Sequence, residues 1–170
     1  LAQKTNGKLI TLDKRRNTFR IITGKKHSST QVDITEASKG IEIDLLNRDF
    51  TINSMAIDIS YLISTTGKTI SLTNIIDPHH GIRDLKVNKL RTTSINSFKS
   101  DPIRLIRAIR ISAQLDLEID EQLQNNISKQ AHLIATSSKE RIRVEFLNIL
   151  RQENSGKWLR VMDSLGLLTQ

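Results

Sequence analysis

The segment Ser100-Asp101-Pro102-Ile103-Arg104-Leu105-Ile106-Arg107-Ala108-Ile109-Arg110 carries the clearest structural signal in this 170-residue chain. Its apolar side chains recur every three or four residues, which is typical of an amphipathic helix with one buried face. Asp101 followed by Pro102 predicts a capping carboxylate and a proline at the first helical position. The stretch therefore predicts a helix that begins close to residue 101 and packs against other elements.

Three arginines, Arg104, Arg107 and Arg110, follow one another at three-residue spacing along this helix. Each step turns back by about 60° on a helix of 3.6 residues per turn, so the side chains form a slowly winding stripe that starts beside Asp101. Guanidinium groups on a partly buried face need an anion, and a triphosphate is a suitable bidentate partner. We interpret the stripe and Asp101 as lining a common cleft for a nucleotide. The alternative is a plain cap followed by solvated arginines.

The residues after this helix are also predicted to be helical, because no strand pattern occurs from about Ser94 onward. Ser137 and Glu140 have the spacing of a capping box at the start of a further helix. Arg141 and Glu145, one helical turn apart, are predicted to form a structural ion pair with each other.

The part of the chain before this region is rich in β-branched residues and alternates in polarity, which predicts strands. Five such strands are predicted, over residues 9–12, 18–23, 31–35, 55–59 and 69–76. The polar residues 13–17 have the length of a hairpin turn, and the pattern changes to helical spacing directly after Gly40. The fold class is therefore α+β, with an α+β domain over residues 1–93 and an all-helical domain over residues 94–170.

Composition narrows the possible functions. The net charge of +8 and the pI near 10 favour a polyanionic partner such as RNA or a nucleoside triphosphate. A membrane partner is disfavoured because no apolar run approaches the roughly 20 residues of a spanning helix. The absence of cysteine excludes disulfides and thiolate metal sites. Because the first residue is Leu1 rather than methionine, we expect the sequence to begin inside a longer protein.

A second group of polar residues, Arg48, Asp49 and Asn53, lies among apolar residues that are expected to be buried. Arg48 can meet a phosphate with its planar fork. Asp49 and Asn53, four residues apart, can hydrogen-bond a sugar hydroxyl from one face. On spacing alone, an Arg-Asp surface pair with Asn53 at the end of a turn is the alternative.

With these residues the chain resembles the family of tRNA CCA-adding enzymes and bacterial poly(A) polymerases. Arg48, Asp49 and Asn53 match the ribose-contacting motif of that family, in which two arginines precede the aspartate, and Asn47 stands in place of the first arginine. The resemblance implies that Arg48, Asp49 and Asn53 hold the ribose and the phosphate of a nucleotide.

The helix at residue 101 resembles the Glu-Asp-x-x-Arg motif of the same family, whose aspartate and arginine pair with the edge of the incoming base in place of a template. Asp101 and Arg104 match this motif, and Ser100 replaces the glutamate that orients the arginine. The resemblance implies that Asp101 and Arg104 read the base. From the arginine stripe we expect Arg107 and Arg110 to hold the triphosphate. Because Ser100 replaces this glutamate, base selectivity is the property that we expect the replacement to affect most.

Asp77, Gly81 and Asp84 resemble the flexible segment that joins the head and the neck of these enzymes. Their implied role is a hinge that moves the head as the added base changes. The neighbouring His79 and His80 are adjacent in an extended turn and lack a third ligand nearby, so a metal site there is disfavoured.

The polymerisation site of the family uses two aspartates, separated by one residue on a strand, to bind two Mg²⁺ ions. This pair is missing from the chain, so the main metal ligands are expected upstream and the isolated chain is expected to be inactive. Asp33, centred in a predicted strand, is a candidate third carboxylate.

The resemblance implies a fold and a function for the whole chain. The expected fold is the remainder of a nucleotidyltransferase head, with an antiparallel or mixed sheet and helices, followed by an all-α neck. The expected reaction is transfer of CMP or AMP from CTP or ATP to the 3′ end of tRNA or another RNA, away from membranes, in the cytoplasm or in an organelle. A bacterial poly(A) polymerase and a non-catalytic RNA-binding module are the alternatives. The order of nucleotides and the oligomeric state are left open.

Overall fold

The computed structural model describes residues 2–14, 17–24, 28–67 and 69–169. These residues divide into two compact units, Leu1–Gly40 and Ile41–Gln170. The fold class is α+β, as predicted. Among the described residues, no helix combines the length and the apolar character that are needed to cross a membrane.

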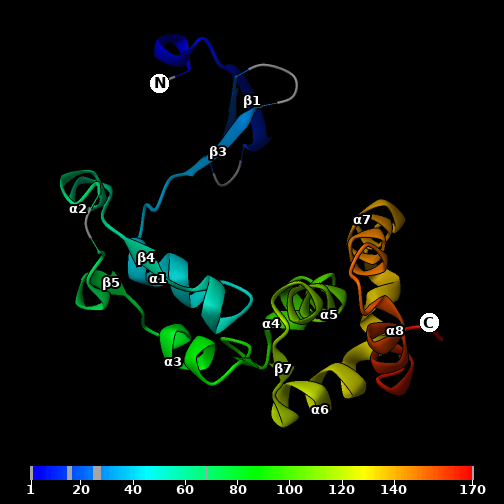
Figure 1. The fold of residues 1–170 in the computed structure, drawn as a ribbon. Helices are drawn as coiled ribbons and strands as arrows, with labels where there is room; N and C mark the ends of the chain where they lie inside the picture. The colour runs from blue at the N-terminus through cyan, green and yellow to red at the C-terminus, as the bar shows by residue number, and fades with distance from the viewer. Residues whose placement is uncertain (1, 15–16, 25–27, 68, 170) are drawn as a thin grey trace. The chain divides into compact units, whose positions relative to one another are not determined.

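The first unit is a three-stranded antiparallel sheet in the order β1-β2-β3 (Figure 1). Its strands are β1 (Lys8–Asp13), β2 (Thr18–Thr23) and β3 (Thr30–Thr35), preceded by the short helix η1 (Gln3–Thr5). The three predicted strands are thus confirmed. Ile21 of the central strand is buried, and its neighbour Arg20 lies opposite Asp33 of β3. Arg15 and Arg16 of the predicted turn lie outside the described residues.

The second unit is mainly helical. Its α-helices are α1 (Ile41–Leu46), α2 (Ile59–Ser64), α3 (Gly81–Lys86), α4 (Ser97–Ser100), α5 (Arg104–Leu115), α6 (Glu121–Gln130), α7 (Lys139–Leu150) and α8 (Ser155–Ser164). Its 3₁₀ helices are η2 (Thr51–Asn53), η3 (Leu72–Asn74) and η4 (Ala131–Thr136). Its strands are the antiparallel pair β4 (Ala56–Ile57) and β5 (Ile75–Ile76) and the parallel pair β6 (Lys89–Leu90) and β7 (Glu118–Ile119).

The strands predicted over residues 55–59 and 69–76 are much shorter in the structure. The carboxylate of Asp58 accepts hydrogen bonds from the backbone N–H groups of Ser60 (2.7 Å) and Tyr61 (3.1 Å), which starts α2 directly after β4. An N-cap aspartate favours this helix start over a longer strand.

The prediction that strands end before Ser94 is wrong at β7. The backbone N–H of Glu118 donates to the carbonyl of Asn88 at 2.8 Å, and that of Asp120 donates to the carbonyl of Leu90 at 3.1 Å. A strand of two residues is too short to produce an alternating pattern, so only the meeting of two distant segments reveals it.

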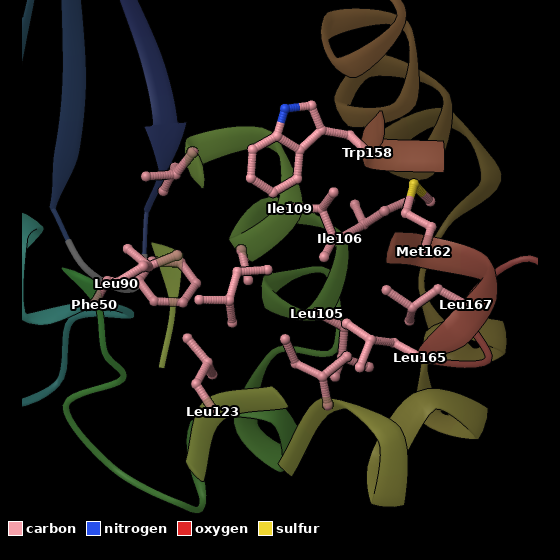
Figure 2. Close-up of a cluster of buried hydrophobic side chains, with 14 of the residues drawn as sticks. Phe50, Leu90, Leu105, Ile106, Ile109, Leu123, Trp158, Met162, Leu165 and Leu167 are labelled. Carbon is pink, nitrogen blue, oxygen red and sulfur yellow. The ribbon is translucent and has the colours of Figure 1, made fainter. Parts of the chain in front are cut away.

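Helix α5 forms the centre of the second unit and packs against α7 and α8. Figure 2 shows Ile106 and Ile109 of α5 beside Trp158 and Met162 of α8. Leu105 and Ile109 are completely buried, and burial of such a side chain stabilises the fold by roughly 2 kcal/mol. The amphipathic helix predicted from the opening stretch is therefore confirmed.

The core does not stop at the predicted boundary near residue 93. Phe50 and Leu90, both completely buried, belong to the same apolar cluster as Leu105 and Leu123 (Figure 2). Residues on both sides of position 93 therefore form one compact unit, which begins at Ile41. The division into functional domains at residue 93 stays a prediction.

Two predicted helix starts are wrong in detail. Helix α5 begins at Arg104, and no side chain caps its N-terminus, because the carboxylate of Asp101 is bonded to Arg141 instead. Helix α7 is capped by Ser138, whose hydroxyl accepts a hydrogen bond from the backbone N–H of Arg141 at 3.4 Å. The cap is therefore one residue later than the predicted box at Ser137.

Candidate functional site

The candidate sugar-contacting segment lies in the turn that follows α1. Phe50 anchors this turn because its side chain is completely buried. The carboxylate of Asp49 accepts a hydrogen bond from the backbone N–H of Phe50 at 2.9 Å and from the side-chain amide of Asn53 at 3.3 Å. The structure thus brings Asp49 and Asn53 together. The buried Asp49 has its position set by the backbone, whereas Asn53 is exposed.

Arg48 lies at the surface beside these two residues. Its guanidinium donates to the carboxylate of Asp44, one turn earlier, at 3.0 and 2.5 Å. The predicted alternative of an Arg-Asp surface pair is thus realised with Asp44 rather than Asp49. Since half of the Arg48 side chain is exposed, a phosphate can compete with Asp44 for it.

Glu145 of α7 accepts hydrogen bonds from the second and third arginines of the α5 stripe, Arg107 and Arg110. The Nε group of Arg107 donates to one oxygen of Glu145 at 3.0 Å, and Nε of Arg110 donates to the other at 2.5 Å. The two arginines therefore share one face, as predicted from their spacing. The residue Glu145 is buried, so its charge is neutralised inside the protein.

Arg107 also joins α5 to the sugar-contacting segment, because its Nη1 group donates to Asp49 at 3.2 Å. Burial lowers the pKa of Arg107, but hydrogen bonds to Glu145 and Asp49 and the charges of these two carboxylates raise it by more, so the pKa lies above its usual value. Arg107 is therefore a permanent cation shared by two carboxylates that are far apart in the sequence.

Within the described residues, Arg141 and Glu145 do not form their predicted ion pair. Glu145 faces inward to Arg107 and Arg110, and Arg141 binds both oxygens of Asp101 at 3.0 and 2.8 Å. The pair predicted from their one-turn spacing is therefore wrong. Their partners lie on α5 and just before it, because the packing of α7 presents both side chains to that element.

Asp101 and Arg104 have partners on different segments. Arg104 donates from Nη1 to the hydroxyl of Ser97 at 2.9 Å and from Nη2 to the carbonyl of Asn47 at 3.1 Å. Asp101 instead binds Arg141 of α7. The four groups thus have partners within the protein, and the predicted common cleft for one carboxylate and three arginines stays a prediction.

Gly81 and Asp84 lie in α3, and Asp77 lies in the turn before it. The carboxylate of Asp77 accepts hydrogen bonds from the backbone N–H groups of Gly81 (2.7 Å) and Ile82 (3.0 Å), and so holds the start of α3. Asp84 is buried and accepts from the hydroxyl of Thr51 at 2.7 Å. The hinge role of these residues stays a prediction.

A pocket of about 340 Å³ opens beside α3. Its lining residues are Thr51, Pro78, His79, His80, Arg83, Asp84, Arg91 and Thr92. None of the four predicted nucleotide-binding residues of the 101–110 stretch lines it. Asp84, one of the predicted hinge residues, does.

Asp33 forms a cross-strand ion pair in the first unit. The guanidinium of Arg20 donates from Nε at 2.6 Å and from Nη2 at 2.8 Å to its two oxygens. Both side chains are substantially exposed. Among the described residues, no group of three histidine, aspartate or glutamate side chains could hold a metal ion. The role of Asp33 as a third carboxylate stays a prediction.

We expect the pKa of the Asp33 carboxyl group to lie below its ordinary value, because hydrogen bonds from Arg20 favour the charged form. A carboxyl whose pKa is lower in the folded state stabilises the fold above the unfolded value, and this contribution is lost as the pH falls through the folded pKa. An NMR titration of side-chain carboxyl carbons in the wild type and in Arg20→Gln measures the effect. Equal midpoints in the two proteins would contradict it.

Comparison with protein families gives two matches along the chain. A family model described as the poly A polymerase head domain matches residues 1–91. A second model, described as a probable RNA and SrmB-binding site of polymerase A, matches residues 116–170.

Similar sequences and structures agree with these matches. A CCA-adding enzyme of Latilactobacillus sakei is 34% identical over 88% of this chain and 35% of its own length. A CC-adding tRNA nucleotidyltransferase of Geobacter sulfurreducens is 30% identical over 98% of this chain and 36% of its own length. The structure of a Thermotoga maritima CCA-adding enzyme complexed with tRNA has a TM-score of 0.78 and 30% identity, covering 98% of this chain and 38% of that one. The chain thus spans about a third of the length of these proteins.

Proposed function

The chain belongs to the family of poly(A) polymerases and tRNA nucleotidyltransferases, and on this basis we propose that the protein containing it adds CMP and AMP to the 3′ end of tRNA without a template. The donors are CTP and ATP, and the acceptor is the 3′ hydroxyl of the RNA. This chain supplies residues that bind and select the nucleotide.

The observation that carries the proposal is the ion pair between Arg107 and Asp49, at 3.2 Å. It joins the sugar-contacting segment to α5 across 58 positions of sequence. Helix α5 also carries Arg104, which is bonded to the carbonyl of Asn47 in that same segment. Groups suited to a sugar and groups suited to a base are thereby held within one compact unit, as a nucleotide site requires.

In this proposal Asp49 and Asn53 hydrogen-bond the ribose, and Arg48 meets a phosphate. The base is read by Asp101, which accepts from an amino group, and by Arg104, which donates to ring nitrogen or carbonyl acceptors. Adenine and cytosine both present an amino group next to a ring nitrogen, so one aspartate and one arginine can serve both bases.

Arg107 and Arg110 are proposed to bind the triphosphate. Each already has a carboxylate partner, and Arg110 also donates to the side chain of Gln114 at 2.7 Å. Phosphate oxygens would keep the two arginines paired during binding, and the buried carboxylate of Glu145 would be released from them. In this proposal the triphosphate competes with Glu145 for hydrogen bonds from Arg107 and Arg110.

Arg104 is oriented in a way that differs from the family motif. Ser100 replaces the motif's glutamate, and the guanidinium of Arg104 is held by the hydroxyl of Ser97 and the carbonyl of Asn47. The serine at position 100 has no carboxylate with which to orient Arg104, and a neutral hydroxyl interacts with a cation less strongly than a carboxylate does. We therefore propose that base selection is less strict than in relatives that retain the glutamate.

Magnesium belongs to this proposal as the ion that activates the 3′ hydroxyl and stabilises the leaving pyrophosphate. The described residues do not form a group that fits such an ion. The role proposed for this chain is therefore binding and orientation of the nucleotide, and no chemical step is assigned to its own carboxylates.

The test is an addition assay with the full-length protein, Mg²⁺ and a tRNA that lacks its terminal nucleotides. Each of CTP, ATP, GTP and UTP is supplied separately and in combination. We expect incorporation of C or A and little incorporation of G or U. Cytosine and adenine present an amino donor for Asp101 beside a ring-nitrogen acceptor for Arg104, whereas guanine presents its amino group beside a ring N–H and uracil has no amino group. A protein that adds no nucleotide to any RNA, yet binds RNA with an affinity that falls with salt, would establish the binding module instead.

A further inference from the structure

We propose that Thr51, Gly81 and Asp84 form a clamp that positions Asp49 and Asn53, and that this clamp sets the preference of the site for ribose over deoxyribose. The inference rests on the proposed function, in which Asp49 and Asn53 hydrogen-bond the sugar. The three clamp residues are positioning residues, since they act through the backbone of the turn and not through contact with the nucleotide.

The turn that the clamp holds is η2, which follows Asp49 and ends at Asn53. Inside it, the backbone N–H of Asn53 donates to the carbonyl of Phe50 at 3.0 Å, and that of Ser54 donates to the carbonyl of Thr51 at 3.0 Å. A 3₁₀ segment of three residues has poor hydrogen-bond geometry and little stability of its own. Its conformation, and with it the spacing of Asp49 and Asn53, therefore depends on what packs against it.

Gly81 makes the closest of these packing contacts. A Cβ atom at this position would lie 2.3 Å from the carbonyl oxygen of Thr51 and 3.1 Å from the Cα of Ile52. The first residue of α3 thus lies directly on the backbone of η2, and only glycine permits this approach.

Asp84 supplies the polar part of the clamp. One of its oxygens accepts the hydroxyl of Thr51 at 2.7 Å, and the other accepts a hydrogen bond from Arg91. Thr51 is 6% exposed and Asp84 3% exposed. A buried carboxylate that is satisfied on both oxygens is held firmly, because either bond leaves an unpaired buried group when it breaks.

Arg91 contacts two of the clamp residues, Thr51 and Asp84. Its backbone carbonyl accepts the N–H of Thr51 at 3.0 Å, and its Nε group donates to Asp120 at 3.1 Å. Burial lowers the pKa of Arg91, but its bonds and charge interactions with Asp84 and Asp120 raise the pKa by more. The cation therefore stays charged, and its Nη1 group donates to Asp84.

These contacts tie the first turn of α3 to η2. A separation of α3 from η2 would break the buried bond between Asp84 and Thr51. The clamp therefore predicts that α3 and the sugar-contacting segment move as one body, so any hinge motion carries both together. A misplaced Asp49 or Asn53 would then lose the bond to the 2′ hydroxyl while leaving the base contacts intact.

Thr51→Val tests the clamp in the full-length protein, because valine keeps the shape of threonine and removes only the hydroxyl. We expect the ratio of kcat/KM for ATP to that for 2′-deoxy-ATP to fall about five-fold, the effect of one weakened hydrogen bond. Thr51→Ser keeps the hydroxyl and should retain the ratio. Thr136→Val is the matched control, since this exposed threonine only donates to the carbonyl of Leu133 at 2.7 Å.

Asp84→Asn is the second variant, because it keeps the side-chain volume and removes the charge that holds Arg91. The ratio of kcat/KM for ATP to that for 2′-deoxy-ATP should fall for this variant too. The fluorescence of Trp158 shows whether the variant is folded. An unchanged ratio in both variants, or equal losses with ATP and 2′-deoxy-ATP, would overturn the clamp. A wild-type protein that adds no nucleotide would overturn the proposed function instead.

Discussion

Arg104→Ala is expected to lower kcat/KM for CTP and ATP by about 100-fold, because it removes charged hydrogen bonds that the proposed function assigns to the base. The same change should weaken discrimination against UTP and GTP. Arg104→Lys should recover little, since a single ammonium group cannot donate in parallel to two acceptors. Addition assays on a tRNA acceptor with each nucleotide measure both effects.

Arg143→Ala is the matched control for Arg104→Ala. Arg143 is an exposed arginine of α7 that takes no part in the proposed site. Its removal should leave kcat/KM and nucleotide preference unchanged. If Arg104→Ala adds nucleotides at the wild-type rate and with the wild-type preference, Arg104 does not act in place of a template.

Glu145→Ala is expected to destabilise the second unit by about 3 kcal/mol, because it leaves Arg107 and Arg110 partly buried without their shared carboxylate. Glu145→Gln keeps the shape and the acceptor oxygen, so its loss should be smaller. Urea unfolding followed by tryptophan fluorescence measures the change. The chain has a single tryptophan, and Trp158 is buried in the core of this unit.

Glu140→Ala provides the comparison within the same helix. Glu140 lies in the first turn of α7 and is exposed, so only a helix-dipole contribution below about 1 kcal/mol is expected to be lost. Equal destabilisation by Glu140→Ala and Glu145→Ala would show that the pairing of Glu145 with the α5 arginines contributes little to stability.

The correct predictions concern features that are encoded locally. The spacing of Ile103, Ile106, Ile109 and Ala113 identified α5, because residues three and four apart share one face of a helix. The strands β1, β2 and β3 followed from alternation and β-branched residues in the same way. The pairing of Asp49 with Asn53 was also accessible, since only four positions separate them.

The helix cap predicted at Asp101 shows where local rules stop. Asp-Pro before an apolar run is a sound capping signal, but Arg141 offers the carboxylate two charged donors, which form stronger hydrogen bonds than a backbone N–H. The competing partner lies 40 positions later in the sequence. A rule based on neighbouring residues cannot predict this pairing, because only the packing of the helices brings Arg141 close to Asp101.

From the sequence alone follow the α+β class, the amphipathic α5 with its arginine face, and the residues that match the nucleotide-site motifs. The tertiary structure decided how the charges are paired: Glu145 with Arg107 and Arg110, Asp101 with Arg141, and Thr51 with Asp84. The physical reason is the distance in sequence between the interacting residues. Helix and strand patterns arise from neighbours in the chain, whereas each of these pairs joins residues at least 33 positions apart and forms only when the packing of the apolar core places their elements side by side.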